Sequence, residues 1–320
     1  MWNKIGRAII LNGFYIVFFC VIVFFSLKAE NFPTLLNLNA ILFQSAPLVI
    51  IATGLTFVII TGSLDISVGS IAFVSSAAAM FVYQLWNIKT IWCVLIVITV
   101  ATLCGLVNGL LIVKLKINPL IVTMGMMISL RGLALFITKG NQITVPKSIY
   151  DFGGAKIAAV YLEVILAISI LIIAQIILSK THLGKYIIAT GCDAGAAKAV
   201  GIKVDIIRII VFILSGFFAG IAGILMMGQS GVVHTSMGQG MEFTAIAVIV
   251  IGGTSLFGGK GSLIPGTLFG TIILILIENG LNYMGISPYF YPFVRGLIIF
   301  IAMFIDSFKY RLKTIERIYG

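Results

Sequence analysis

Seven ionisable residues lie within or at the edges of long apolar stretches. Charge is costly in a membrane-spanning segment and usually marks a substrate or ion path there, so these groups are the first candidates for function. They are Asp65, Arg131, Glu163, Glu242, Glu278, Arg295 and Asp306. Three stand near the predicted ends of their stretches, where snorkelling to the surface or helix capping is the favoured role: Glu163, Arg295 and Asp306.

The remaining charged candidates allow more than one role. Asp65 opens a new apolar run after a Gly-Ser pair, so capping of a helix that begins at Ile66 is favoured over lining of a polar path. Arg131 and Glu278 lie deeper in their runs. An unpaired Arg131 would be expensive there, so we expect it to meet a carboxylate, backbone carbonyls or a polar cavity.

Carboxamide side chains form a second set of candidates. Asn and Gln both donate and accept hydrogen bonds, as contact with a sugar hydroxyl requires, although bonding between helices is the more common role. The amides are Asn108, Asn118, Gln142, Asn279 and Asn282. The candidate residues of a substrate path are then Asp65, Asn108, Asn118, Arg131, Glu278, Asn279 and Asn282.

The residue types that an enzyme needs are scarce. The two histidines, His182 and His234, fall in separate loops, and the four cysteines have no metal-binding spacing. Residues 253–262 superficially suggest a phosphate-binding loop, but Thr254 and Gly261 stand where that motif requires Gly and Ser or Thr. We therefore expect no enzyme and no bound cofactor or metal, and any ATP-driven step must use another polypeptide.

The elements that position these residues are predicted to be membrane helices. Of 320 residues, 60% are hydrophobic and 10% charged, and the mean hydropathy is +1.18, whereas soluble proteins have about 25% charged residues. The sequence predicts an all-α, polytopic membrane protein with a single transmembrane domain over residues 1–320. Its ten apolar runs cover residues 8–27, 40–61, 66–84, 91–113, 119–137, 158–178, 206–228, 242–252, 263–279 and 290–308.

Two features of these runs affect their interpretation. The first run is too long for a signal peptide, and charged residues follow it where a cleavage site needs small neutral ones. The runs within 40–84 and within 242–279 are separated only by short Gly/Ser-rich breaks. Some of these elements are therefore expected to be broken or re-entrant half-helices.

The distribution of Lys and Arg predicts the orientation. With the N-terminus inside, 13 basic residues fall on the inner side and five on the outer side, which places both termini in the cytoplasm. The inner ones are Lys4, Arg7, Lys114, Lys116, Lys180, Lys185, Lys198, Lys203, Lys260, Lys309, Arg311, Lys313 and Arg317; the outer ones are Lys28, Lys89, Lys139, Lys147 and Lys156. The excess of 21 basic over 10 acidic residues thus indicates membrane topology, not nucleic-acid binding.

The longest polar interruption, residues 179–205, falls on the predicted inner side. It contains an Ala-rich stretch led by Asp193, which can cap a short helix between Gly191 and Gly201. A short helix on a membrane surface has little to bury by itself. We therefore expect it to dock onto a partner.

The two Gly/Ser-rich breaks carry a faint internal repeat. In the first break, Ser63-Leu64 is followed after four residues by Gly69-Ser70. In the second break, Ser255-Leu256 is followed after four residues by Gly261-Ser262. Transporters often contain two related halves with broken helices at matching positions. Coincidence in a chain rich in Gly and Ser is the alternative.

Several stretches resemble one protein family along nearly the whole chain. Residues 61–70 read T-G-S-L-D-I-S-V-G-S, close to the pattern G-x-D-L-S-V-G-S, and residues 123–132 resemble a ribose-type fifth span. Residues 252–261 and 296–307 are similar as well. The family is that of the ten-span permeases of bacterial ABC importers for monosaccharides, typified by the ribose permease.

The inner loop resembles the cytoplasmic coupling segment of this family, A-x-G-G-N-x-x-A-A-x-x-x-G-I. Residues 189–202 match it with Cys192 in place of Gly and Asp193 in place of Asn, and both remain compatible with a helix cap. The resemblance implies that residues 179–205 dock an ATPase, through Gly184, Lys185, Ala189, Gly191, Asp193, Ala196, Ala197 and Gly201. Arg in place of Ala197 is expected to abolish ATPase association without preventing membrane insertion.

The resemblance also implies the partners and the mechanism. It predicts a permease in the bacterial cytoplasmic membrane that pairs with a second copy or paralogue and receives sugar from an extracytoplasmic binding protein. A cytoplasmic ATPase pair that binds ATP and Mg drives alternating access. Ribose is the first choice of substrate, and galactose, xylose, inositol-like polyols and a furanosyl signalling molecule are others. An ion-coupled secondary carrier or a channel for small polar solutes is the competing interpretation.

Overall fold

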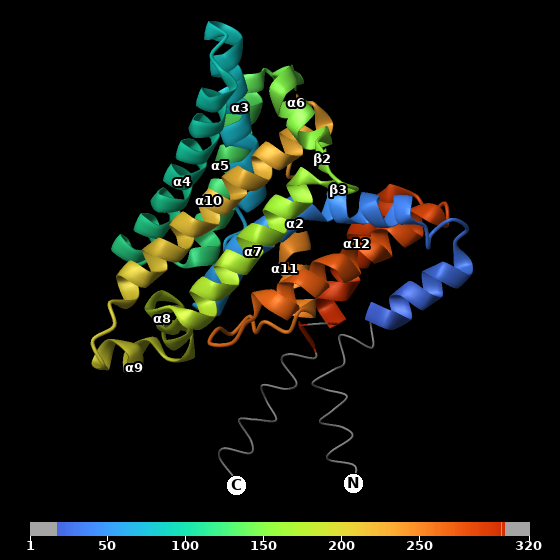
Figure 1. The fold of residues 1–320 in the computed structure, drawn as a ribbon. Coiled ribbons are helices and arrows are strands. Elements are labelled where there is room, and N and C mark those ends of the chain that lie inside the picture. Colours follow the sequence, from blue (N-terminus) through green and yellow to red (C-terminus); the bar gives the residue numbers. More distant parts are fainter. Residues whose placement is uncertain (1–17, 302, 305–320) are drawn as a thin grey trace, which may run out of the picture.

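Apolar helices make up most of the structure, a computed structural model that describes residues 18–301, 303 and 304 (Figure 1). Within these residues, seven helical segments are long and apolar enough to cross a bilayer. They are α2 (Leu35–Ile60), α3 (Val68–Trp86), α4 (Thr90–Lys114), α5 (Pro119–Thr138), α7 (Leu162–Lys180), α10 (Val204–Ser230), and α12 (Leu268–Tyr283) with the preceding π-helical turn η1 (Leu263–Thr267).

Three shorter apolar helices accompany the long ones in the described part of the chain: Phe18–Lys28, α11 (Met241–Ile251) and Pro288–Ile301, which begins with the 3₁₀ turn η2 (Pro288–Phe290). With 11 residues, α11 is about 16 Å long, roughly half of the hydrocarbon thickness of about 30 Å. This helix is therefore too short to cross a bilayer alone. The shorter helices α6 (Lys147–Gly154), α8 (His182–Cys192) and α9 (Ala194–Ala199) lie between the long ones in sequence.

Two small antiparallel ladders tie connecting segments together. Strand β1 (Ile143–Thr144) pairs with β4 (Val232–Val233), which joins the segment after α5 to the segment after α10. Strand β2 (Lys156–Ile157) pairs with β3 (Val160–Tyr161) just before α7. In Figure 1, α6 and β2 lie at one end of the helices and α8 and α9 at the other; we call these the α6 end and the α9 end.

The predicted all-helical membrane fold is confirmed in outline, and the predicted runs overlap the apolar helices. Runs 8–27 and 290–308 extend into residues outside the described part of the chain, where Asp306 also lies. Helix α2 begins five residues before the predicted run because the Thr34 side chain caps it, accepting from the Asn37 amide at 3.2 Å. The ten-span count and the orientation stay predictions.

Small residues allow α4 and α10 to approach closely. A Cβ atom on Gly105 of α4 would lie 2.3 Å from the carbonyl oxygen of Phe212, and one on Gly216 of α10 would lie 2.3 Å from that of Ala101. Contacts between small residues let helix backbones pack in a membrane, where no hydrophobic force drives the helices together. Helix α2 is buried from Ser45 to its end at Ile60, and it packs on α10 through Gly54, whose missing Cβ leaves space for Phe218.

We expect Gly216→Ala to destabilise the protein by about 1–3 kcal/mol, because the added methyl group forces the backbones of α4 and α10 apart. The midpoint of thermal unfolding in detergent measures this loss. Gly125→Ala is the matched control, since Gly125 is also helical and, within the described residues, no atom of another element lies within 4 Å of its would-be Cβ. Equal melting temperatures for the two variants would contradict the packing explanation.

Candidate functional site

The C-terminal end of α8 meets two interruptions of the membrane helices. A Cβ atom on Gly191 would lie 1.7 Å from the carbonyl oxygen of Ile60, the last residue of α2, and 2.6 Å from the Gly259 amide nitrogen. That amide donates to Ile60 O at 2.8 Å, and Cys192 Sγ donates to Gly259 O at 3.5 Å. We call Ile60, Gly191, Cys192 and Gly259 the α8 junction.

The two breaks that echo each other in sequence touch at this junction. Gly258, in the segment between α11 and η1, has φ +86°, and a Cβ on it would lie 2.9 Å from Gly62 N and 3.0 Å from Gly191 O. One break follows α2 and the other follows α11, so each joins two helices, as the echo indicates. The end of α8 is thus in contact with both breaks at once.

The short helix predicted in the inner loop is present as α9. Asp193 Oδ1 accepts from the amides of Gly195 at 2.8 Å and Ala196 at 3.0 Å, and the helix ends before Gly201, which has φ +86°. Most of the remaining predicted loop is helix α8, which begins after a cap by Thr181. Both helices form because a local side-chain cap satisfies their first amides.

The eight predicted docking residues gather at the α9 end but do not share one environment. The exposed ones are Lys185, Asp193, Ala196 and Gly201, the half-buried ones are Ala189 and Gly191, and the buried ones are Gly184 and Ala197. Ala197 is only 4% exposed. Its side chain therefore packs within the protein, and Arg at this position would disturb α9 itself before reaching a partner.

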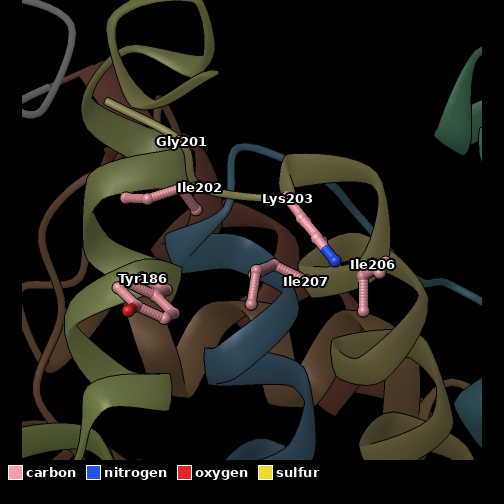
Figure 2. Close-up of a pocket in the computed structure, with 6 residues that line it drawn as sticks. All are labelled: Tyr186, Gly201, Ile202, Lys203, Ile206 and Ile207. Carbon is pink, nitrogen blue, oxygen red and sulfur yellow. The ribbon is translucent and has the colours of Figure 1, made fainter. Parts of the chain in front are cut away.

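A hollow of about 260 Å³ separates α8 from the start of α10 (Figure 2). Tyr186 lines it from α8, Ile206 and Ile207 from α10, and residues 201–203 from the connection between α9 and α10. The Lys198 ammonium pairs with Asp205 at 3.6 Å beside this connection. The α9 end thus presents a concave, mixed apolar and basic surface.

A buried polar cluster connects the break after α2 to α4 and α10. Asp65 Oδ1 accepts from the amide and hydroxyl of Ser67, and Asp65 Oδ2 accepts from Ser215 Oγ at 2.8 Å. Asn108 Nδ2 donates to Ser67 Oγ at 2.9 Å. All four side chains are buried, and in the described structure Asn108 Oδ1 has no hydrogen-bond partner. We call these residues the Asp65 cluster.

The predicted capping role of Asp65 is wrong in detail. Helix α3 begins at Val68 rather than Ile66, and its N-cap residue is Ser67. Asp65 instead accepts from the Ser67 amide across a two-residue turn and reaches Ser215 of α10. The carboxylate therefore joins the break before α3 to a residue of α10 that is 150 positions away in sequence.

Arg131 finds its partners in the segment between β4 and α11. Its guanidinium donates to the carbonyl oxygens of Met237 at 3.3 Å and Thr235 at 3.5 Å, and it lies 5.5 Å from the ring centre of Phe73. Backbone carbonyls were one of the predicted options. Together with the aromatic face, they provide a cation with neutral electron-rich contacts in place of water.

The first turn of α3 contacts both the segment before α11 and the first turn of α11. Gly238, with φ +68°, lies so close to Gly69 that a Cβ on Gly69 would be 2.1 Å from Gly238 O and 2.7 Å from Glu242 Oε2. Glu242 is 5% exposed, and its Oε2 has no hydrogen-bond partner within the described residues. A carboxylate at this position complements the positive N-terminal ends of both helices.

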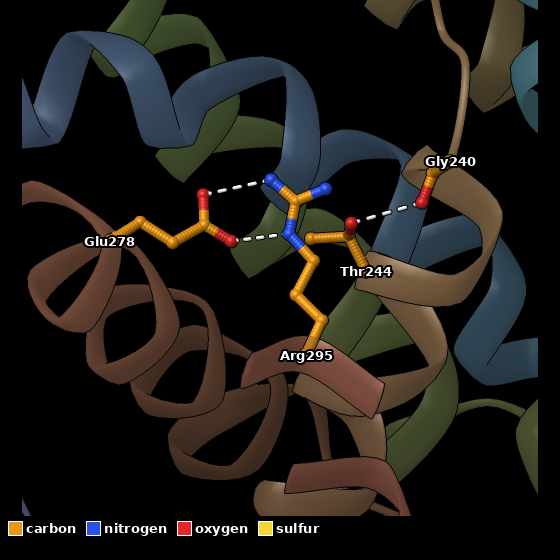
Figure 3. A network of polar contacts seen from close by, with 4 residues as sticks. All are labelled: Gly240, Thr244, Glu278 and Arg295. Carbon is orange, nitrogen blue, oxygen red and sulfur yellow. Dashed lines mark hydrogen bonds and ion pairs between the residues drawn. The ribbon is translucent and has the colours of Figure 1, made fainter. Parts of the chain in front are cut away.

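Glu278 and Arg295 pair with each other (Figure 3). Arg295 donates from Nε and Nη2 to the two carboxylate oxygens of Glu278, the second bond measuring 2.9 Å. This bidentate ion pair joins α12 to the helix Pro288–Ile301. It lies beside the start of α11, where the Thr244 hydroxyl donates to the Gly240 carbonyl oxygen. The predicted snorkelling or capping of Arg295 is therefore wrong, because a carboxylate on the neighbouring helix satisfies its charge.

Glu163 also departs from its predicted role. It is buried at the start of α7, where its Oε2 accepts from Gln229 Nε2 at 2.8 Å and its Oε1 has no partner among the described residues. Gln229 also donates to Phe43 O at 2.8 Å. Glu163 thus binds α10 and neither snorkels nor caps its own helix.

The other amide candidates have structural partners or lie at the surface. Asn118 caps α5 by accepting from the Leu120 amide at 2.9 Å, and Asn279 accepts from Asn37 at 2.9 Å. Asn282 and Gln142 are exposed. Of the seven predicted path residues, the structure brings only Asp65 and Asn108 into one hydrogen-bonded group.

The two histidines do not form a site. His182 begins α8, whereas His234 lies before α11, where burial lowers its pKa and its Nδ1 lies 3.0 Å from Ser236 Oγ. Within the described residues, no three His, Cys, Asp or Glu side chains are placed to hold a metal ion.

Three polar residues that the sequence interpretation overlooked hold the breaks in place. Ser67 and Ser215 complete the Asp65 cluster, and Gln175 Oε1 of α7 accepts from the amides of Leu263 at 3.2 Å and Ile264 at 3.0 Å in η1. Of the three, only Ser67 could have been found from the local sequence, because an Asp side chain commonly accepts a hydrogen bond from the backbone amide two residues later. Ser215 and Gln175 bond to residues far away in sequence.

Comparison with known proteins gives consistent similarities. A family model described as branched-chain amino acid transport system / permease component matches residues 37–303. The ribose import permease protein RbsC of Escherichia coli (strain K12) is 34% identical over 294 residues, 90% of this chain and 91% of that protein. No solved structure is detectably similar.

Two further relatives come from the same organism. The probable ABC transporter permease protein YphD is 35% identical over 303 residues, 94% of this chain and 88% of that protein. The galactose/methyl galactoside import permease protein MglC is 30% identical over 324 residues, 94% of this chain and 95% of that protein. The similarity therefore covers the helices, the α8 junction and the Asp65 cluster alike.

Proposed function

Because this chain belongs to the family of branched-chain amino acid transport system permease components, we propose that it imports a monosaccharide, ribose in the first instance. It does so as the membrane subunit of an ATP-driven importer in the bacterial cytoplasmic membrane. The observation that carries this proposal is the similarity to ribose and galactose import permeases over at least 90% of the chain. The family description favours an amino acid as the second candidate substrate.

The proposed orientation places the α9 end in the cytoplasm. Lys114, Lys180 and Lys203 stand where α4 and α7 end and where α10 begins, and Lys185 and Lys198 belong to α8 and α9. Fewer basic residues flank the elements of the α6 end. This bias is the one that cytoplasmic loops show. It supports the orientation that the threading of ten apolar runs predicts, with both termini on the cytoplasmic side.

The proposed mechanism starts from the α8 junction. An ATPase that binds the exposed face of α9 can move α8. Because Gly191 has no side chain, the backbone of α8 there contacts the backbone of Ile60 and Gly259 directly. Displacement there reaches the breaks after α2 and after α11 together. Broken helices at matching positions are the elements that rock in alternating-access transporters.

The proposed sugar path runs past the break between α2 and α3. Asp65 and Asn108 are the two path candidates that lie together, and the free Oδ1 of Asn108 can accept from a sugar hydroxyl when the cluster opens. Arg131 and Glu242 hold the segment before α11 and the first turn of that helix against α3. Glu278, Asn279 and Asn118 act in helix packing or capping.

The proposed assembly contains further subunits besides this chain. This chain pairs with a second permease copy or paralogue, a cytoplasmic ATPase pair supplies ATP hydrolysis with Mg, and an extracytoplasmic binding protein delivers the sugar. The permease makes and breaks no covalent bond. Its charged groups instead serve docking, packing and path lining.

Uptake of labelled ribose into intact cells tests the proposal. We expect uptake to require both this chain and a co-encoded ATPase, and to be lost when either gene is deleted. Uptake of labelled leucine serves as the comparison for the amino-acid alternative. Uptake that persists in ATP-depleted vesicles with an ion gradient would instead establish an ion-coupled carrier.

We expect Ala196→Arg to abolish copurification of the ATPase while leaving the melting temperature of the permease unchanged, because Ala196 is exposed on α9. Ala197→Arg should lower the melting temperature as well, since Ala197 is buried. Ala159→Arg, at an exposed residue between β2 and β3, is the control. Retained copurification with Ala196→Arg would show that α9 is not the docking element.

A further inference from the structure

A second concave surface lies far from the α8 junction, among α4, α6, α7 and α10. It is a groove of about 510 Å³ whose walls include Ile98, Phe152, Ile170, Phe217 and Ile221. Three of its four helices have the length and hydropathy of membrane spans. Lipid is therefore the medium that reaches this groove, and its apolar walls offer no hydrogen-bonding groups to a sugar.

One end of the groove is polar. Thr90 Oγ1 of α4 and Ser148 Oγ of α6 both line the groove and are hydrogen-bonded to each other. Each is directly preceded by a lysine, Lys89 before Thr90 and Lys147 before Ser148, and both lysines are exposed. The bond between the hydroxyls holds the two lysine backbones near each other, so both ammonium groups can reach one anion at the mouth of the groove.

We propose that this groove binds an anionic phospholipid, with one acyl chain along the apolar walls and the phosphate between Lys89 and Lys147. The chemistry of the two parts matches an amphiphile and not a soluble ligand. The lysines attract an anionic headgroup, and the walls bury hydrocarbon. Of the two paired hydroxyls of Thr90 and Ser148, the one that accepts from the other keeps its own hydrogen free to donate to a phosphate oxygen. The proposal does not depend on the transported substrate or on the orientation of the chain.

Native mass spectrometry of the purified full chain with phosphatidylglycerol or phosphatidylcholine tests the site. Two lysines beside an anionic lipid together raise the binding affinity for that lipid by about thirtyfold. We expect Lys89→Gln/Lys147→Gln to weaken retention of phosphatidylglycerol by that factor and to leave phosphatidylcholine unaffected. Lys28→Gln/Lys139→Gln, also at exposed lysines, controls for net charge.

Filling the groove tests the acyl-chain part separately. Ile221→Trp should remove both lipids, whereas Ile173→Trp, at a residue of α7 that is 57% exposed and outside the groove, should remove neither. Equal lipid retention by the two Trp variants, or equal loss with both pairs of lysine variants, would overturn the proposal. Loss of permease dimers without loss of lipid in Ile221→Trp would overturn it too, since the groove would then be an interface between copies.

Discussion

Substitution of Gly191 by Ala should separate ATP hydrolysis from transport. The new methyl group would lie 1.7 Å from Ile60 O and 2.6 Å from Gly259 N, and both are backbone atoms that cannot rotate away. The end of α8 must therefore move off the two breaks. Coupling between distant sites is typically worth about 1–3 kcal/mol, so we expect sugar uptake to fall about 5- to 150-fold.

ATPase binding should survive this substitution because the exposed residues of α9, including Ala196 and Lys198, do not take part in the Gly191 contact. The measurements are uptake, copurification of the ATPase and ATP hydrolysis by the reconstituted complex. Gly195→Ala is the matched control, since its would-be Cβ meets only the side chain of Asp193, at 3.2 Å. Unchanged uptake in Gly191→Ala, or the same loss in Gly195→Ala, would refute the role of the α8 junction.

The features that the sequence predicts well are those with local causes. Long apolar runs predict helices because the backbone must satisfy its own hydrogen bonds in lipid. The cap of α9 by Asp193 needs only the next three residues, and its prediction is confirmed. The breaks after α2 and α11 are likewise visible as short Gly/Ser-rich stretches, and the structure has both.

The errors concern partners that are distant in sequence. Glu163 and Arg295 look like residues at helix ends, yet Gln229 lies 66 residues and Glu278 17 residues away, each on another helix. The resemblance to the coupling segment names Ala197 as a docking residue, and nothing in the sequence indicates that the packing of α9 buries its side chain. Pairing between helices depends on their rotation and depth, and nearly uniform hydrophobicity leaves both undetermined in the sequence.

Replacement of Asp65 by Leu should cost about 3 kcal/mol of folding free energy or more, because the hydroxyls of Ser67 and Ser215 lose their acceptor while buried. Asp65→Asn has nearly the same shape and can still accept from Ser67, while the rotating hydroxyl of Ser215 can accept from the new amide. We therefore expect the Asn variant to fold with a much smaller loss. Thermal unfolding in detergent distinguishes the two.

Transport by the Asp65→Asn variant then decides what the charge does. If Asp65 serves only to join the break after α2 to α10, uptake should follow stability and stay near the level of the unmodified protein. If the carboxylate lines the sugar path, uptake should fall although the variant folds, and we expect this second outcome because the cluster also contains the free Oδ1 of Asn108. Ser75→Ala controls for loss of a buried hydroxyl, since within the described residues Ser75 bonds only to carbonyls of its own helix. Normal uptake in Asp65→Asn would assign the cluster to folding alone and move the sugar path elsewhere.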